Sequence, residues 1–192
     1  MNNMVLYISV ILFSMLVIVI CNYFIYLPTY NFDLPYIVTA VVLSTILEII
    51  IDLIFAFIVR RMLPSKWFSA NKKYFAGKRE RKFYDKIFIK KWKDKVPDLG
   101  ALSGFRKNKI AKPNDEEYLS RYIVEANYGI FVHVACMIFG FLVIFVYPLK
   151  FWHCFGLPVS LVNLVLNLLP IFVLRYNLPK LHKLLAFKNG QK

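Results

Sequence analysis

The chain has 192 residues, of which 59% are hydrophobic, and it carries 25 Lys and Arg against 11 Asp and Glu. Soluble domains contain about 45–50% apolar residues, so this composition excludes a disordered chain and disfavours a soluble core. Three scattered cysteines exclude a disulfide scaffold, and their spacing predicts no metal site. The length predicts a single domain, residues 1–192. The question that follows is where along this domain the net charge of +14 lies.

Four long apolar segments predict an all-α integral membrane protein. A hydrocarbon core about 30 Å thick needs about 20 helical residues, and lipid admits only elements whose backbone groups are bonded internally. We expect transmembrane helices over residues 4–27, 36–59, 127–147 and 157–174. The first segment has no basic leader and no small-residue cleavage site, so we expect a retained helix rather than a signal peptide.

The basic residues lie almost entirely between the second and third apolar segments. Residues 61–121 hold 18 Lys and Arg against 7 Asp and Glu, a local net charge of +11. The other two connections contain a single basic residue, Lys150. By the positive-inside rule we expect the central segment, the N-terminus and the tail 175–192 to be cytoplasmic. The predicted architecture is therefore two membrane hairpins joined by a basic cytoplasmic segment.

Aromatic residues within the central segment distinguish it from a solvated linker. Between residues 81 and 96, Tyr84, Phe88, Trp92 and Val96 recur every four positions, which predicts one apolar stripe on a helix. A basic amphipathic helix of this kind is typical of the membrane interface, so membrane lipids are expected partners. Nucleic acid is not, because the segment matches no nucleic-acid-binding motif.

The remainder of the central segment is predicted to lead into the third span. Pro97 is expected to end the amphipathic helix, followed by a turn over residues 97–100. Asn114 is the expected N-cap of the next helix, and Glu117 would complete a capping box with it. That helix is predicted to continue into the apolar segment 127–147.

Polar residues within the spans predict the location of a site, because a charged group at a helix centre costs about 2.5–3.5 kcal/mol. The second span carries Ser44, Glu48 and Asp52 on one face, and the fourth carries Asn163 and Asn167. At about 1.5 Å per helical residue, Asp52 and Asn167 lie about 12 Å from the cytoplasmic ends of their spans.

The third span carries two further polar residues, His133 and Glu125. His133 is expected about 9 Å deep, close to the depth of Asp52 and Asn167. Each has a structural alternative: His133 as an interhelical hydrogen bond, and Glu125 as an ion pair with Arg121 one turn earlier.

The second half of the chain resembles a known family. The basic aromatic stretch 82–95 around Trp92, then Glu125 and His133, then Asn167 and the run 175–181 resemble the glycosyl-4,4′-diaponeurosporenoate acyltransferase family over residues 75–186. The type reaction of that family esterifies a sugar hydroxyl of a glycosylated C30 carotenoid with a fatty acyl group, the last step towards staphyloxanthin. The resemblance implies a multi-pass protein of a bacterial plasma membrane, with functional importance for Trp92, Glu125, His133, Asn167, Arg175 and Asn177.

Acyl transfer suggests a role for each of these polar residues. His133 is the expected general base, oriented by Asp52, since an imidazole titrates near neutral pH. Asn167 would polarise the acyl carbonyl, and Glu125 would bind the acceptor sugar. The remaining expected substrate contacts, with the phosphates of an acyl-CoA co-substrate or with the lipid, are Lys91, Lys93, Arg175, Trp92 and Asn177. We expect no further cofactor, and direct transfer rather than an acyl-enzyme.

Two other functions remain open from the sequence. One is a non-catalytic membrane-anchored module that binds lipid or a partner protein through its basic face, for which the charge would matter and His133 would not. The other is a small membrane methyltransferase or reductase, although no adenosine or nicotinamide fingerprint is present. The acceptor lipid, the acyl donor and the oligomeric state also remain open.

Overall fold

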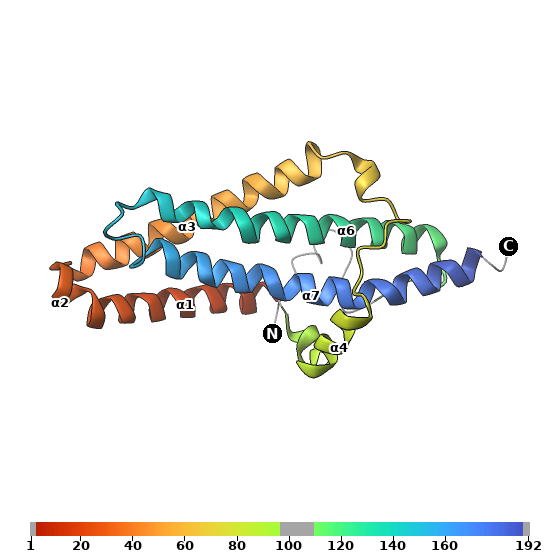
Figure 1. The fold of residues 1–192 in the computed structure, drawn as a ribbon, viewed down its shortest axis with the longest axis horizontal. Coiled ribbons are helices and arrows are strands. Elements are labelled where there is room, and N and C mark those ends of the chain that lie inside the picture. Colours follow the sequence, from red (N-terminus) through yellow and green to blue (C-terminus); the bar gives the residue numbers. More distant parts are fainter. Residues whose placement is uncertain (1–2, 97–109, 190–192) are drawn as a thin grey trace. The chain divides into compact units, whose positions relative to one another are not determined.

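The computed structural model describes residues 3–96 and 110–189, and within these ranges every regular element is a helix (Figure 1). The α-helices and 3-10 helices (η) are, in chain order, α1 (Asn3–Ile25), α2 (Leu27–Tyr30), α3 (Leu34–Arg61), η1 (Ser65–Trp67), α4 (Lys78–Lys86), α5 (Ile89–Trp92), η2 (Lys93–Lys95), α6 (Glu116–Phe139), η4 (Gly140–Val146) and α7 (Gly156–Asn189). The all-α prediction is confirmed for the described residues.

Four of these helical segments are long and apolar enough to cross a membrane: Met4–Ile25, Leu34–Arg61, Glu116–Val146 and Gly156–Lys188. The four predicted spans are therefore confirmed as helices. The third span continues the helix predicted to begin after Asn114, and the fourth extends beyond residue 174 into the basic tail. At about 1.5 Å per residue, the 34 residues of α7 exceed the thickness of a hydrocarbon core. The hairpin pairing and the membrane orientation remain predictions.

The chain divides into two compact units. Unit 1 consists of Met1–Phe57 and Ala135–Asn167, and unit 2 consists of Ile58–Val134 and Leu168–Lys192. The boundary between them falls within α3, α6 and α7.

Unit 1 has an apolar core formed by α1, the first half of α3 and the start of α7. Ile18, Val41 and Phe155 are among its buried members. Aromatic residues cluster where the short connections of this unit lie, and they are Tyr26, Tyr30, Phe32, Tyr36, Tyr147, Phe151 and Phe155. Such belts of aromatic residues are typical of a membrane–water interface.

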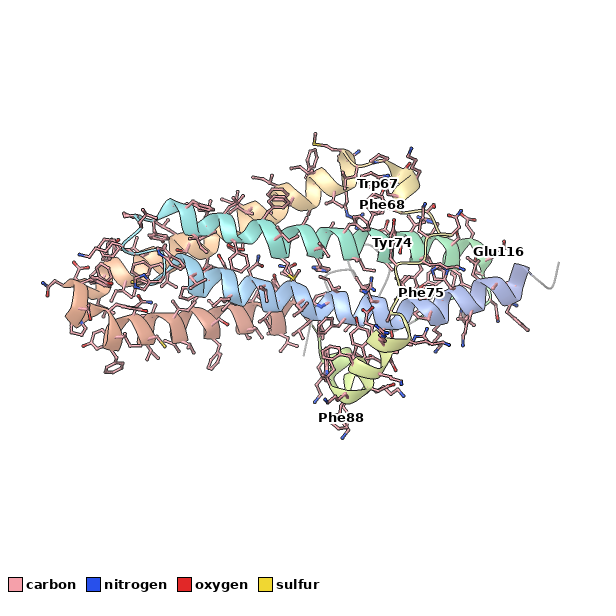
Figure 2. All side chains as sticks on the ribbon, viewed as in Figure 1. Trp67, Phe68, Tyr74, Phe75, Phe88 and Glu116 are labelled. Atoms are coloured by element: carbon pink, nitrogen blue, oxygen red, sulfur yellow. The ribbon has the colours of Figure 1, made fainter. Side chains whose placement is uncertain are left out.

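Unit 2 has its core between α6 and the second half of α7, with Leu119, Ile123 and Leu178 fully buried. The segment that follows η1 packs against this core through Tyr74 and Phe75, which are labelled in Figure 2. The helical path of α7 continues through Pro170 and Pro179. Each proline removes one backbone hydrogen bond, while the buried leucines of α7 hold the helix in the core. The tail predicted from residue 175 is therefore helical as far as Asn189.

The predicted single helix over residues 81–96 is wrong. The chain forms α4, then breaks at Phe88, which has a left-handed backbone (φ 53°), before α5 and η2. The break changes which side chains share a face, so that Ile89 is buried while Phe88 is 63% exposed. Tyr84, Ile89 and Trp92 pack with the α7 aromatics Phe172 and Tyr176. Tyr84 and Trp92 of the predicted stripe therefore lie in a protein core, whereas Phe88 is exposed. The contact of this segment with the membrane interface remains a prediction.

The start of α6 differs by one residue from the prediction. Asp115, not Asn114, caps the helix, because its Oδ1 accepts a hydrogen bond from the backbone nitrogen of Tyr118 at 3.0 Å. A carboxylate at this position also interacts favourably with the helix dipole. The predicted turn over residues 97–100 lies outside the described residues.

Candidate functional site

A cluster of carboxylates and amides lies inside unit 1. Glu48 and Asp52 are one turn apart on α3, and Asn163 and Asn167 are one turn apart on α7. The Asn163 Nδ2 donates to Glu48 Oε1 and lies 3.2 Å from Asp52 Oδ1. The Asn167 Nδ2 lies 3.4 Å from Asp52 Oδ2 and 2.7 Å from Asn163 Oδ1. The predicted proximity of Asp52 and Asn167 agrees with this geometry.

The backbone of α6 and η4 completes the cluster. The Asn163 amide also reaches the Cys136 carbonyl at 3.3 Å. One turn later, a methyl group on Gly140 would collide with the Glu48 carboxylate and the Asn163 amide nitrogen. The Gly140 carbonyl in turn accepts a hydrogen bond from the Ser160 hydroxyl at 3.2 Å. Glycine at position 140 therefore gives the carboxylate–amide pair the space it occupies.

The two carboxylates have no cationic partner among the residues that the structure describes. Glu48 is 5% exposed, and its buried Oε2 atom has no hydrogen-bond partner in the part of the chain that the structure describes. Most buried polar groups are paired, so a buried carboxylate oxygen without a partner needs an explanation. Both carboxylates line a cavity of about 40 Å³ together with Tyr7, Ser14 and Asn163.

His133 lies on α6 within unit 2 and is half-buried. One turn earlier, Gly129 allows close packing, since a methyl group there would lie 3.0 Å from the side chain of Leu174. Asp52 belongs to the other unit, so the predicted orientation of His133 by Asp52 remains a prediction.

The sequence suggested Arg121 as a partner of Glu125, but the partner in the structure is Arg60. The Glu125 carboxylate accepts a hydrogen bond from the Arg60 guanidinium at 3.0 Å. Arg60 also lies 5.5 Å from the ring centroid of Tyr128. The end of α3 is 65 positions away in the sequence, and local spacing cannot reveal such a pair. The predicted role of Glu125 in binding the sugar remains a prediction.

Arg175 takes part in a second ion pair of unit 2. Its Nε and Nη2 donate to the two oxygens of Glu80 at 2.7 and 2.6 Å, and its Nη1 donates to the Tyr74 carbonyl at 2.8 Å. The hydrogen bonds from Arg175 hold the pKa of Glu80 below its usual value. Tyr84, which donates to the same carboxylate, has its pKa raised, chiefly by burial. These N–H groups of Arg175 bind other residues of the protein in this structure. The predicted contact of Arg175 with a phosphate of acyl-CoA remains a prediction.

Three of the other predicted substrate-binding residues lie on or next to α5, and the fourth, Asn177, lies on α7. The Trp92 indole donates to the Ile87 carbonyl at 2.9 Å, which fixes its ring in the unit 2 core. Lys93 pairs with Asp94 at 3.1 Å, and Lys91 lies 4.9 Å from the ring centroid of Phe88. Asn177 is half-buried on α7.

The sequence reasoning missed the partner roles of several site residues. Asn163 was noted as polar but not expected to join both carboxylates, although its spacing of four from Asn167 was an available signal. Tyr7, in the cavity wall, and Glu80, the partner of Arg175, were not identified. The one local signal for Glu80 is its place as the acidic residue in the first turn of α4.

Comparison with known families identifies the second half of the molecule. A family model described as CrtO, glycosyl-4,4′-diaponeurosporenoate acyltransferase, matches residues 64–187. The chain belongs to this family. Membership supports a carotenoid-related acyltransferase in general terms. No curated protein and no solved structure matches the chain. The amides Asn163 and Asn167 lie inside the region matched by the acyltransferase family, and the carboxylates of α3 lie outside it.

Proposed function

We propose that the protein transfers a fatty acyl group from an activated donor, an acyl-CoA, to a sugar hydroxyl of a glycosylated lipid. The observation that carries this proposal is the family match over residues 64–187, which spans α4 to α7. Four helices with the length and apolarity of membrane spans suit two substrates with long apolar tails. A glycosylated C30 carotenoid is the acceptor that the family name suggests.

In the proposed reaction the hydroxyl oxygen of the sugar attacks the carbonyl carbon of the thioester. His133 accepts the hydroxyl proton as the new carbon–oxygen bond forms, and the carbon–sulfur bond then breaks. The proton passes to the departing thiolate, so that the products are an ester and the free thiol of CoA. An imidazole is suited to both proton transfers because its pKa lies near the working pH.

The other polar residues have supporting roles in this proposal. Asn167 donates to the carbonyl oxygen as negative charge develops on it, and Glu125 and Asn177 contact the sugar. The basic surface of α4, α5 and η2, with Lys91, attracts the phosphates of the donor. Membrane-facing Lys and Arg contribute about 1 kcal/mol each towards an anionic partner.

The test compares the purified wild type with His133→Ala, using labelled long-chain acyl-CoA and a glucosylated lipid in detergent. Loss of a general base lowers the rate by about 10²–10⁴-fold, so we expect ester formation to fall by that factor. His153→Ala is the matched control, because His153 lies in the connection before α7 and has no proposed role. Equal ester formation by wild type and His133→Ala would overturn the assignment of the base. If the wild type forms no ester with any glycosylated lipid, a lipid-binding module is the better description.

A further inference from the structure

Unit 1 contains a cavity whose carboxylates, on α3, lie outside the family match. Its walls come from α1, α3 and α7, and its polar members are Tyr7, Ser14, Thr45, Glu48, Asp52 and Asn163. The Thr45 hydroxyl is used by its own helix, since it donates to the Val41 carbonyl at 2.8 Å. The carboxylates and the hydroxyls of α1 therefore give the cavity its chemistry.

Among the residues that the structure describes, one carboxylate oxygen of this cavity has no hydrogen-bond donor. The Asn163 and Asn167 side-chain amides supply four N–H groups in total. These groups reach three carboxylate oxygens and the Asn163 side-chain oxygen. They also approach the carbonyls of Cys136 and Asn163, which lie within α6 and α7 and already accept helical backbone hydrogen bonds. The fourth carboxylate oxygen, Glu48 Oε2, is buried and receives no donor from the described residues.

Protonation of Glu48 does not resolve this deficit. An ionised Oε2 lacks a donor, and a protonated Oε2 would carry an O–H group without an acceptor. A buried polar atom in either state costs about 1–3 kcal/mol. A ligand hydroxyl satisfies both states, because it can donate to the carboxylate and accept from a carboxylic acid.

A hydroxyl also fits better than a metal ion. The Asn163 N–H groups point at Glu48 Oε1 and Asp52 Oδ1, and their positive ends would repel a cation at those oxygens. Hard cations need about six or more oxygen ligands, and no metal-binding group of three or more His, Cys, Asp or Glu was found in the described residues. The cavity of about 40 Å³ accepts groups of the size of a water or a hydroxyl.

We propose that Glu48, Asp52 and Asn163 form a hydroxyl-binding subsite that receives one hydroxyl of the sugar headgroup of the acceptor. This inference rests on the proposed function for the identity of the ligand. Ser14 and Tyr7 lie seven residues apart on α1, hence on one face, and both line the same cavity. The subsite gives a role in acceptor recognition to Glu48 and Asp52, which precede the family match.

The experiment measures binding without any acyl donor, so that its result is independent of acyl transfer. Wild type in nanodiscs is titrated with a fluorescent alkyl β-glucoside, and with an alkyl phosphocholine of equal chain length as the control ligand. We expect saturable binding of the glucoside, weakened about tenfold or more in Glu48→Gln. Ser44→Ala is the matched control variant, since Ser44 is buried one turn earlier on α3 and its hydroxyl reaches the Ala40 carbonyl at 2.7 Å.

A set of deoxy-glucosides, each lacking one hydroxyl, tests the inference on the wild type alone. One deoxy analogue should bind the wild type about tenfold more weakly, and the same analogue should show no further loss with Glu48→Gln. Equal affinity of the wild type for every analogue would overturn the subsite. So would a thermal stability that follows sodium concentration and not the glucoside, because the cavity would then hold a cation.

Failures of the two proposals differ in their outcomes. Binding that depends on Glu48 without ester formation supports the subsite and rejects acyl transfer. Ester formation with an unchanged KM for the acceptor in Glu48→Gln supports acyl transfer and rejects the subsite. If Glu48→Gln does not fold, the wild type and the deoxy analogues decide the question.

Discussion

Carboxylates in the two units are compensated in different ways. In unit 2 a guanidinium meets each of two carboxylates, Arg175 with Glu80 and Arg60 with Glu125. In unit 1 the carboxylates of α3 meet the amides of α7, and no ion pair to them exists among the described residues. The carboxylates of both units lie within long apolar helices or beside them. The two units therefore differ in the chemical type of the carboxylate's partner, a guanidinium or an amide.

The difference indicates what each arrangement is for. A paired carboxylate with several hydrogen bonds holds elements together, as the Glu80 pair joins α4 to α7. A buried carboxylate solvated by neutral amides keeps acceptor capacity for a ligand, and ionisable residues of this kind within membrane spans mark functional sites. We therefore expect substitutions in the Glu80–Arg175 pair to affect folding first, and those at the unit 1 carboxylates to affect binding first.

The largest expected effect tests the ion pair of unit 2. Arg175→Met would leave the half-buried Glu80 carboxylate and the Tyr74 carbonyl without their donor. We expect the free energy of unfolding to fall by about 2–4 kcal/mol, measured by thermal and denaturant unfolding in detergent. Asp85→Asn is the control, because it removes an exposed pair with Lys90 at 3.9 Å, for which about 0–1 kcal/mol is typical. Equal effects of both substitutions would contradict the structural role of the Arg175 pair.

The next effect tests the packing around the unit 1 carboxylates. Gly140→Ala would place a methyl group against the Glu48 carboxylate and the Asn163 amide. Overpacking of this kind costs about 1–3 kcal/mol, and we expect weaker glucoside binding together with a lower unfolding midpoint. Gly77→Ala is the matched control, since nothing lies within 4 Å of a methyl group there and the backbone φ of −70° suits alanine. A Gly140→Ala protein with wild-type stability and binding would show that the close approach has no role.

The sequence predicts the long elements of this fold well. Runs of about 20 apolar residues have one solution in lipid, and the four predicted spans are helical. Their ends are less predictable, because they depend on tertiary burial. The helix α7 continues past Pro179 because Leu178 is fully buried in the unit 2 core. The hydropathy of the sequence does not reveal this burial.

The site is predictable in part for the same reason. Spacing of four places Glu48 with Asp52 on one helix face, but it does not say which helix the face meets. The partners of Glu48, Asp52 and Glu80 come from residues more than 90 positions away. Phe88 shows a further limit: a periodic pattern predicted a continuous helix, and a single left-handed residue changed the buried face.

A pH series sharpens the comparison between the two units. Because Arg175 lowers the pKa of Glu80 below its ordinary value of 4.5, the pair stabilises the folded state fully above that value. This stabilisation is lost as the pH falls through the lowered pKa. We expect Glu80→Gln to cost about 1–2 kcal/mol at pH 7, and its difference from wild type to shrink below about pH 4.5, as followed by unfolding midpoints at each pH.

Glu48→Gln is the corresponding substitution in unit 1, and at pH 7 we expect its unfolding midpoint to equal or exceed that of the wild type. Glutamine has the shape of the glutamate side chain and carries no charge, so it avoids the desolvation cost that an ionised Glu48 would have. A midpoint lowered as much as in Glu80→Gln would remove the distinction between structural and ligand-binding carboxylates.

The smallest expected effect concerns Phe88. Unlike the buried residues of the unit 2 core, Phe88 is expected to lower the stability of the folded chain. Its backbone is left-handed at φ 53° and its side chain is 63% exposed, pointing away from α4 and α5 in Figure 2. A left-handed conformation costs most residues about 1–2 kcal/mol, whereas asparagine adopts it readily.

We therefore expect Phe88→Asn to raise the free energy of unfolding by about 0.5 kcal/mol, after loss of the contact with Lys91, which is worth about 0.5–1 kcal/mol at an exposed site. A chain that retains a strained, exposed aromatic residue among lysines gains something other than stability from it, and the predicted membrane interface supplies a reason. Hydrogen exchange of residues 78–96 in nanodiscs tests this: anionic lipid should protect the wild-type segment more than the Phe88→Asn segment. Equal protection of both segments, with the stability gain intact, would leave the strain at Phe88 without a role in lipid contact.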